Sequence, residues 1–304
     1  MVPVLCGPTA SGKTYAALRL ARAAPIEVIS ADSRQLYRGF DIGTAKPDAA
    51  ERAAVPHHGI DVLHPAERAS AAWWAERATG WIEDVLARGR IPLVVGGTGL
   101  YLRALFGVMF TEPPMDPDRR RALEVELAPL DTAELRRRVE RLDPDRAHLG
   151  RSQLLRAIEI ALLTGRRLSD LHRERATMPR WRARYLVVDP GASLSATIAV
   201  RTRAMFAAGW REEVRRLMVS VPSDAPAWNA SGYRVIRALE QGELSPEAAM
   251  ERVIIETRQY AKRQRTWFRH QLLDGDVTRL DAGHADAEAA LMAWWTSDAT
   301  RGAA

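Results

Sequence analysis

The amino-acid sequence predicts an α/β protein in which helices flank a parallel sheet and a helical insertion interrupts the sheet-forming part of the chain. Three observations favour this fold class. Short apolar runs typical of buried strands alternate with helical patterns, a glycine-rich loop follows the first run, and an Arg- and Glu-rich stretch at 113–184 has helical patterns with no strand among them. With 304 residues, 47% apolar and 27% charged, the chain forms one large domain or two modest ones, which excludes disorder, collagen and a disulfide scaffold.

Each predicted strand is a short apolar run that ends near a Gly, Pro or Asp, as expected for strands covered on both faces. These runs lie at 2–6, 26–30, 91–97 and 184–190. The helices of the core carry apolar residues at helical spacing. They lie at 15–24, 70–88, 193–219, 232–240, 245–271 and 285–296.

The insertion is predicted because, after Pro113 and Pro114, helical patterns rich in Arg and Glu replace the alternation of apolar runs and helices. Its helical patterns lie at 117–128, 132–141 and 151–164. We therefore expect a core formed by 1–112 and 185–304 and an all-helical insertion at 113–184. Residues 117–184 hold 17 Arg against 11 acidic residues, whereas the rest of the chain is balanced at 27 against 27. A segregated basic excess favours a polyanionic partner, the alternative being solvated helix faces.

The composition also bears on location. The first residues lack the features of a secretory signal, and no run of eighteen apolar residues is present. The single cysteine, Cys6, lies on a predicted buried strand and suits a reducing compartment. We expect a cytoplasmic protein with no membrane association and no obligate protein partner.

The loop at 7–14, GPTASGKT, matches G-x-x-x-x-G-K-[ST] between a predicted strand and a predicted helix, which is how a P-loop NTPase-like domain begins. Its amide groups and the following helix N-terminus attract phosphate, Lys13 adds a positive charge, and the Thr14 hydroxyl ligates Mg²⁺. The residues predicted to bind diphosphate are Gly7, Thr9, Ala10, Ser11, Gly12, Lys13 and Thr14. The loop indicates a diphosphate or triphosphate ligand with magnesium, and a nucleotide such as ATP is one candidate.

Asp32 is the carboxylate that follows the second predicted strand. A P-loop kinase or NTPase is expected to carry an Asp at the end of a further strand, but the run at 91–97 ends in glycines. Asp32 therefore has two interpretations from its position alone. It assists the metal, or it is a base facing a second substrate at the carboxyl ends of the strands.

Six segments together go beyond a generic P-loop protein. They are GPTASGKT at 7–14, SADSRQLYRGFDIGTAKP at 30–47, VPHHGIDVLHP at 55–65, IPLVVGGTGLYLRAL at 91–105, ASGYRVI at 230–236 and TRQYAKRQRTWFR at 257–269. This set resembles the bacterial tRNA dimethylallyltransferase (IPP transferase) family over about 5–270. The second and last segments are not shared with kinases.

The resemblance implies an enzyme that transfers a dimethylallyl group from dimethylallyl diphosphate to N6 of the adenosine 3′-adjacent to the anticodon, with release of diphosphate. It implies Mg²⁺ as cofactor, Asp32 as the catalytic base and Thr98 beside it in the reaction channel. The implied macromolecular partner is the tRNA anticodon stem-loop, contacted in part by the insertion.

The resemblance also implies which residues contact tRNA. They are Asp32, Ser33, Arg34, Gln35, Arg120, Gln153, Arg156, Gly232, Tyr233, Arg234, Lys262, Arg263, Arg265 and Arg269. Relatives carry Q-R-L-x-R where this chain has SQLLR at 152–156, so the first arginine of that pattern is missing. Along 245–271, basic residues recur at helical spacing and form a stripe.

Three alternatives remain open from the sequence. An isopentenyltransferase acting on free adenine nucleotides keeps the same loop, a P-loop small-molecule kinase shares only the loop, and a non-catalytic RNA-binding protein leaves Asp32 and Thr98 without a role. His57 and His58 resemble a metal pair, but no cluster of further ligands accompanies them, so we interpret them as structural.

Overall fold

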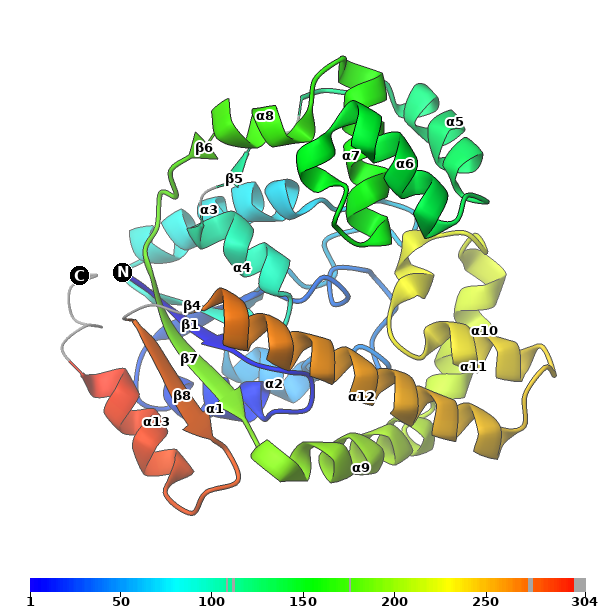
Figure 1. The fold of residues 1–304 in the computed structure, drawn as a ribbon. Helices are drawn as coiled ribbons and strands as arrows, with labels where there is room; N and C mark the ends of the chain where they lie inside the picture. Colours follow the sequence, from blue (N-terminus) through cyan, green and yellow to red (C-terminus); the bar gives the residue numbers. More distant parts are fainter. Residues whose placement is uncertain (108, 111–112, 175, 273–275, 298–304) are drawn as a thin grey trace. The chain divides into compact units, whose positions relative to one another are not determined.

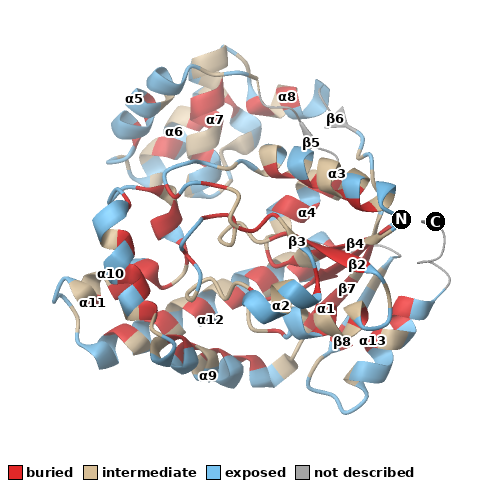
Figure 2. Cartoon of the chain, turned by 180° about the vertical axis from the view of Figure 1, so that it is seen from behind, coloured by how far each residue is buried: buried red, intermediate tan, exposed pale blue. Residues whose placement is uncertain are grey.

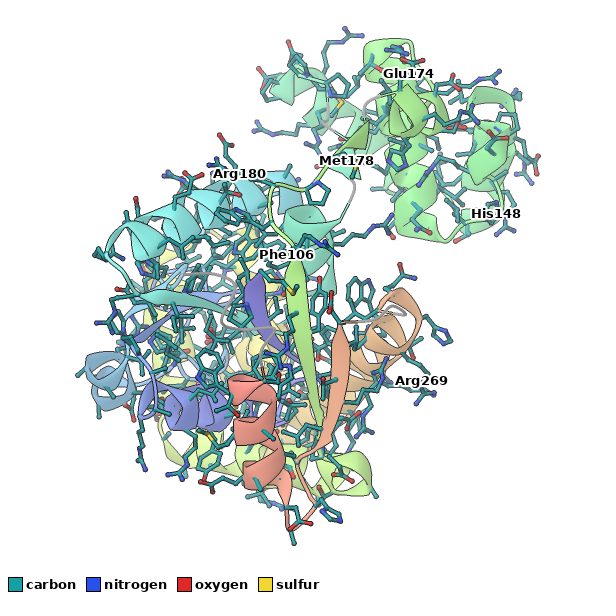
Figure 3. The ribbon with its side chains drawn as sticks, turned by 90° about the vertical axis from the view of Figure 1, so that its left-hand side faces the viewer. Phe106, His148, Glu174, Met178, Arg180 and Arg269 are labelled. Atoms are coloured by element: carbon teal, nitrogen blue, oxygen red, sulfur yellow. The ribbon has the colours of Figure 1, made fainter. Side chains whose placement is uncertain are left out.

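The computed structural model describes residues 1–107, 109–110, 113–174, 176–272 and 276–297. Two compact units are formed, a core unit of Met1–Phe106 with Arg180–Ala304 and an insertion unit of Gly107–Pro179. Figure 3 labels Phe106 and Arg180, where the chain leaves and re-enters the core unit. The observed insertion is shifted a few residues towards the N-terminus from the expected 113–184, because helix α4 ends at Phe106 and strand β7 already begins at Ala183.

A six-stranded sheet forms the centre of the core unit, and every neighbouring pair of its strands is parallel (Figure 1). In spatial order the strands are β3 (His57–His58), β2 (Ile26–Ser30), β4 (Ile91–Gly96), β1 (Val2–Cys6), β7 (Ala183–Asp189) and β8 (Val277–Asp281). The predicted α/β fold with a parallel sheet is confirmed, as are its four predicted strands. The edge strands β3 and β8 were not predicted, because β3 has two residues and β8 is mostly exposed and polar.

Both faces of the sheet are covered by helices, as alternate residues of each strand show. Leu5 packs with α1 (Lys13–Ala21) and α13 (Ala287–Thr296). Val4 and Cys6 face the opposite cluster. The helices that contribute to it include α3 (Ala71–Ala87), α4 (Gly99–Phe106) and α12 (Pro246–Gln271). Figure 2 shows the strands buried between helices whose outer faces are exposed.

The remaining helices of the core unit follow β2 and β7. They are α2 (Ala49–Ala54), α9 (Leu194–Ala207), α10 (Trp210–Ser220) and α11 (Tyr233–Glu240). The single helix predicted at 193–219 is two helices, because Gly209 has a φ of 93° and interrupts the helical backbone. Within the described ranges, no helix has both the length and the apolar character needed to cross a membrane.

The insertion unit has its own hydrophobic core. Its helices are α5 (Pro117–Leu127), α6 (Thr132–Leu142), α7 (Arg151–Thr164) and α8 (Leu168–Glu174). The Asp116 and Asp131 side chains accept hydrogen bonds from the first turns of α5 and α6, which fixes where these helices begin. The three predicted helices are present. Beyond them, the unit contains α8 and a short antiparallel pair, β5 (Met109–Phe110) with β6 (Ala176–Thr177), so the expectation that the insertion is all-helical is wrong at its two ends.

Candidate active site

Three loops meet at the carboxyl edge of the sheet, because β1, β4 and β2 are parallel neighbours. They are the loop after β1 (residues 7–12), the segment after β2 (31–35) and the turn after β4 (97–98). The backbone N–H of Thr98 donates to the carbonyl of Ala31 at 3.1 Å, so the last two loops are tied directly. The fold thus brings together the phosphate loop, Asp32 and Thr98, which are far apart in the sequence.

The phosphate loop has the backbone that its glycines allow. Gly7 has a φ of 150°, and a Cβ there would lie 2.1 Å from the Val188 carbonyl oxygen. Gly12 has a φ of 89° and precedes α1 directly. The Lys13 ammonium donates to the carbonyls of Gly7 at 3.0 Å and Pro8 at 2.6 Å. Burial lowers the pKa of Lys13 to about 8, so the ammonium loses its proton at a lower pH than a lysine in water does.

Thr9, in the middle of this loop, is held by two side chains that the sequence analysis did not single out. The Arg201 guanidinium, from α9, donates to the Thr9 hydroxyl at 2.5 Å. The backbone N–H of Thr9 donates to Oε1 of Gln264, from α12, at 2.8 Å. Burial lowers the pKa of Arg201, which the nearby Asp32 carboxylate partly offsets. Arg201 lies outside the recognised motifs, so nothing in the sequence pointed to it. Gln264 lies within AKRQRTWFR, where the neighbouring Lys and Arg residues drew the prediction instead.

Asp32 and Thr98 are linked by hydrogen bonds to the short backbone segment 33–34. Oδ1 of Asp32 accepts the Arg34 N–H at 2.8 Å, and the Thr98 hydroxyl oxygen accepts the Ser33 N–H at 3.0 Å. The electrostatic surroundings of Asp32 also include Tyr260 of α12. Burial, with the Asp32 charge as a second cause, raises the pKa of Tyr260 to about 12, so the phenol stays protonated.

A narrow cavity opens beside these groups and combines polar with apolar walls. Its polar side includes Asp32, Arg201 and the hydroxyl-bearing residues of the lining, and its apolar side includes Met205 and Trp210. The lining residues are Thr9, Asp32, Arg34, Gly43, Thr44, Arg201, Thr202, Met205, Trp210, Ala230, Ser231, Val253, Thr257 and Tyr260. Such a site suits a ligand with an anionic end and a short hydrocarbon end.

One wall of the cavity, the segment 41–45, is anchored from α10 and α11. The buried Glu213 carboxylate accepts the N–H groups of Asp41 and Ile42 at 3.1 and 2.8 Å. Tyr233 donates its hydroxyl to Glu213 at 2.6 Å and accepts the Gly43 N–H at 3.1 Å. Burial raises the pKa of Tyr233 well above its usual value, which keeps the hydroxyl a donor.

The predicted tRNA contact at Tyr233 needs correction for this reason. Its side chain is fully buried and faces Glu213, so it supports the cavity wall and is inaccessible to an RNA. Gly232 lets the chain pass Trp210, whose ring would lie 2.4 Å from a Cβ at this position. Arg234 is exposed at the start of α11 and stays a predicted contact.

Gln35 also makes internal contacts. Its amide nitrogen donates to the carbonyls of Thr44 and Ala45 at 3.3 and 3.1 Å. Its amide oxygen accepts the Ser30 hydroxyl at 3.0 Å. Gln35 therefore also holds the cavity wall, and any contact with a nucleobase would be made in addition to these hydrogen bonds.

The basic stripe of α12 divides into two groups. Lys262, Arg263 and Arg269 are exposed, and Figure 3 shows Arg269 near the C-terminal end of the helix. Arg265 instead pairs with the Asp189 carboxylate at the end of β7, with its Nε at 3.1 Å from Oδ1, and with the Gly191 carbonyl. The role of Arg265 in tRNA binding stays a prediction, and a phosphate bound there would compete with Asp189 for the guanidinium.

In the insertion unit, two predicted tRNA contacts share one acidic partner. Arg120 of α5 and Arg156 of α7 both form ion pairs with Glu159, whose side chain is nearly buried. Gln153, where relatives carry the first arginine of their pattern, caps the start of α7 by accepting the Gly150 N–H at 3.3 Å. The roles of these residues in RNA binding stay predictions.

The histidine pair has structural partners. Nδ1 of His57 lies 2.6 Å from the Val55 carbonyl, and Nε2 of His58 lies 2.7 Å from the buried Glu27 carboxylate, which also pairs with Arg88 at 2.7 Å. Over the described ranges, no group of three or more His, Cys, Asp or Glu could hold a metal ion. Cys6 is fully buried, and burial raises its pKa to about 12.

Comparison with protein-family models gives a match to the IPP transferase model over residues 35–271, well over half of the chain. The chain belongs to the IPP transferase family. The isopentenyl transferase model also matches residues 1–56, which contain the phosphate loop. Among individual relatives of this IPP transferase, a tRNA dimethylallyltransferase of Thermus thermophilus is 43% identical and covers 96% of this chain and 97% of its own.

Solved structures give the same assignment. A tRNA delta(2)-isopentenylpyrophosphate transferase from Staphylococcus epidermidis is 31% identical, with a TM-score of 0.69 and 99% coverage of both chains. A eukaryotic dimethylallyltransferase acting on tRNA is 27% identical, with a TM-score of 0.78, covering 99% of this chain and 77% of its own. The predicted family and fold of this IPP transferase are thereby confirmed.

Proposed function

We propose that this protein transfers a dimethylallyl group from dimethylallyl diphosphate to N6 of the adenosine 3′-adjacent to the anticodon of tRNA, and releases diphosphate. One observation carries the proposal. In a chain of this family, Asp32 lies beside Thr98 at the same sheet edge as a phosphate loop whose lysine is half-buried and bonded to the loop carbonyls. The catalytic base and the leaving-group site are thus supplied by neighbouring loops.

The phosphate loop stabilises the leaving group in this proposal. When the allylic C–O bond breaks, its electron pair stays with the diphosphate, so negative charge builds up on that side. Lys13 can exchange its carbonyl partners for phosphate oxygens, and the half-buried Arg201 guanidinium adds a second cation at Thr9. Both groups interact more strongly with the departing diphosphate than with the intact ester.

Asp32 acts on the acceptor in this proposal. The exocyclic amine of adenine is a weak nucleophile because its lone pair is delocalised into the ring. As the new C–N bond forms, the N6 proton passes to the Asp32 carboxylate, a transfer that contributes about 10² to 10⁴ in rate. The adenine has to leave the base stack of the anticodon loop to reach this position. The apolar wall at Met205 and Trp210 suits the hydrocarbon chain.

Magnesium fits this site as an ion that arrives with the substrate. The Thr14 side chain lies at the exposed start of α1, and the described residues offer no cluster of three carboxylate, His or Cys ligands. Mg²⁺ keeps several waters and accepts phosphate oxygens as ligands, so one hydroxyl from the protein is sufficient. When bound, it would neutralise charge on the diphosphate, and Thr14 would hold it.

Exposed cations supply the tRNA interaction in this proposal. Lys262, Arg263 and Arg269 are exposed on α12, and Arg34 lies next to Asp32, the proposed catalytic base. Phosphate contacts of this kind position an RNA without reading its sequence. The arginines of the insertion are proposed to add further contacts.

The test is incubation of the protein with Mg²⁺, dimethylallyl diphosphate and unmodified tRNA, followed by mass spectrometry of the nucleosides. We expect an adenosine heavier by one dimethylallyl group at the position next to the anticodon. Product on free AMP and none on tRNA would support the nucleotide isopentenyltransferase. Transfer of the terminal phosphoryl group of ATP would support a kinase, and RNA binding without product would support a non-catalytic protein.

A further inference from the structure

Gln264 connects the two loops that carry the proposed chemistry. Its Oε1 accepts the backbone N–H of Thr9 in the phosphate loop at 2.8 Å, and its Nε2 donates to the Gly97 carbonyl at 2.9 Å. The side chain is 6% exposed, so water does not compete for these bonds. One amide group thus spans the distance between the phosphate loop and the turn that ends in Thr98.

The turn after β4 is shaped to receive this side chain. A Cβ on Gly97 would lie 2.4 Å from Nε2 of Gln264, and a Cβ on Gly99 would lie 2.3 Å from the Trp267 ring. Gln264 and Trp267 are three residues apart and lie on the same face of α12. The glycines of GGTG therefore give α12 its close approach, in addition to any freedom they give the turn.

We infer that Gln264 is a positioning residue that sets the separation between the diphosphate cradle and the acceptor site at Asp32 and Thr98. This inference rests on the proposed function. The Arg201 guanidinium fixes the Thr9 hydroxyl while Gln264 fixes the Thr9 amide, so both polar groups of this residue are oriented from outside the loop. Bringing the reacting carbon to the amine depends on that separation, and small misplacements reduce rate strongly.

The bonding pattern makes a specific demand on residue 264, which must accept from Thr9 and donate to Gly97. The Gln264→Glu variant meets both demands only when its carboxyl is protonated. Ionised, it places an oxygen against the Gly97 carbonyl with no hydrogen between them. The Gln264→Met variant keeps a similar shape and meets neither demand at any pH.

The experiment measures the affinity of each variant for magnesium pyrophosphate between pH 5.5 and pH 8, as a ratio to the wild-type protein at the same pH. We expect Gln264→Glu to bind at least about tenfold more weakly at pH 8, with the ratio returning towards one as the pH falls. Gln264→Met should show a deficit that does not change with pH. Rates of tRNA prenylation should follow the same pattern, mainly through kcat.

Dividing by the wild-type affinity cancels any pH effect of the charged and titratable groups around residue 264, because both proteins contain them. These groups are Lys13, Asp32 and Arg201 together with Tyr260 and Arg265 of α12. Gln259→Glu, an exposed position on the same helix, is the matched control, and its ratio should stay near one. A pH-independent deficit in Gln264→Glu, or wild-type affinity in Gln264→Met, would overturn the inference. Failure of the wild-type protein to prenylate tRNA would instead count against the proposed function, since pyrophosphate affinity is measured independently.

Discussion

Lys13 is the cation of the phosphate loop, and its environment differs strongly from water. Burial lowers its pKa to about 8, and its ammonium bonds the loop carbonyls of Gly7 and Pro8. A bound diphosphate would favour the charged form and return the pKa towards its usual range. Diphosphate binding and protonation of Lys13 are therefore coupled, because each favours the other.

The first prediction follows from that pKa. Above about pH 8 the ligand-free Lys13 loses its proton, so binding of the anion requires proton uptake and affinity falls by up to about tenfold per pH unit. Pyrophosphate affinity should be measured from pH 6.5 to 9.5. In Lys13→Ala the affinity should be weak and this additional pH dependence absent, which also corrects for the titration of pyrophosphate itself. Equal slopes of log affinity against pH in the wild-type protein and Lys13→Ala would contradict the assignment. So would a loss of tRNA affinity in Lys13→Ala as large as its loss of pyrophosphate affinity.

The second prediction concerns Asp32. Asp32→Asn keeps an oxygen that can accept the Arg34 N–H but removes the basicity, so turnover should fall by about 10² or more while tRNA affinity stays nearly unchanged. Single-turnover rates and filter binding measure the two effects. Asp48→Asn, the same chemical change at the exposed N-cap of α2, is the control and should leave both unaffected. Lost tRNA binding with normal turnover would reverse the role given to Asp32.

At the scale of elements, the cavity wall is built by helices that lie far from it in the sequence. Glu213 and Tyr233 come from α10 and α11, yet together they satisfy three consecutive backbone N–H groups from Asp41 to Gly43. A buried carboxylate is stable here because backbone amides and a phenol surround it. The DIGTAKP segment is thus a loop whose shape depends on distant side chains.

The third prediction tests this anchoring. Tyr233→Phe removes one donor to Glu213 and the acceptor of the Gly43 N–H, so the free energy of unfolding should fall by about 1–3 kcal/mol. Urea denaturation measures this change. Tyr15→Phe, whose side chain is 62% exposed, should change the free energy of unfolding by less than about 0.5 kcal/mol. An unchanged midpoint for Tyr233→Phe would show that the loop is held by other contacts.

At the scale of the whole molecule, the chain forms two compact units, and arginines occur in both of them. The core unit contains the cavity, the phosphate loop and the exposed cations of α12. The insertion unit, residues 107–179, holds 14 Arg against 13 acidic residues, so the Arg excess expected for it is not present, and Arg120 and Arg156 already share Glu159. An RNA phosphate that binds these arginines has to compete with a nearly buried carboxylate.

The fourth prediction addresses that competition. Arg120→Ala should weaken tRNA binding and lower the slope of log affinity against log salt by at most about 0.7 to 0.9, the value for one phosphate contact. Filter binding over a range of KCl concentrations gives the slope. Arg216→Ala, which removes an exposed charge from α10 in the core unit, is the control for lost net charge. An unchanged slope in Arg120→Ala would show that this arginine serves the ion pair with Glu159 and no phosphate.

Much of the site could be predicted because its motifs follow strands. Strands β1, β2 and β4 are recognisable as apolar runs, and parallel strands place their carboxyl ends at one edge, so the phosphate loop, Asp32 and Thr98 are expected at the same edge. The strand order β2-β4-β1, which makes them neighbours, is seen only in the structure. One error arose where a side chain's direction mattered. Tyr233 shares its motif with the exposed Arg234 but faces Glu213 in the interior, which the order of residue types does not reveal.

By itself, the sequence determined the family, the α/β fold, the phosphate loop and the carboxylate at the sheet edge, because each of these is encoded by residues close together in the chain. Only the tertiary structure decided what holds the site in shape. Arg201 and Gln264 reach Thr9 from 192 and 255 residues away. No local spacing encodes such contacts, since they depend on how α9 and α12 pack against the sheet.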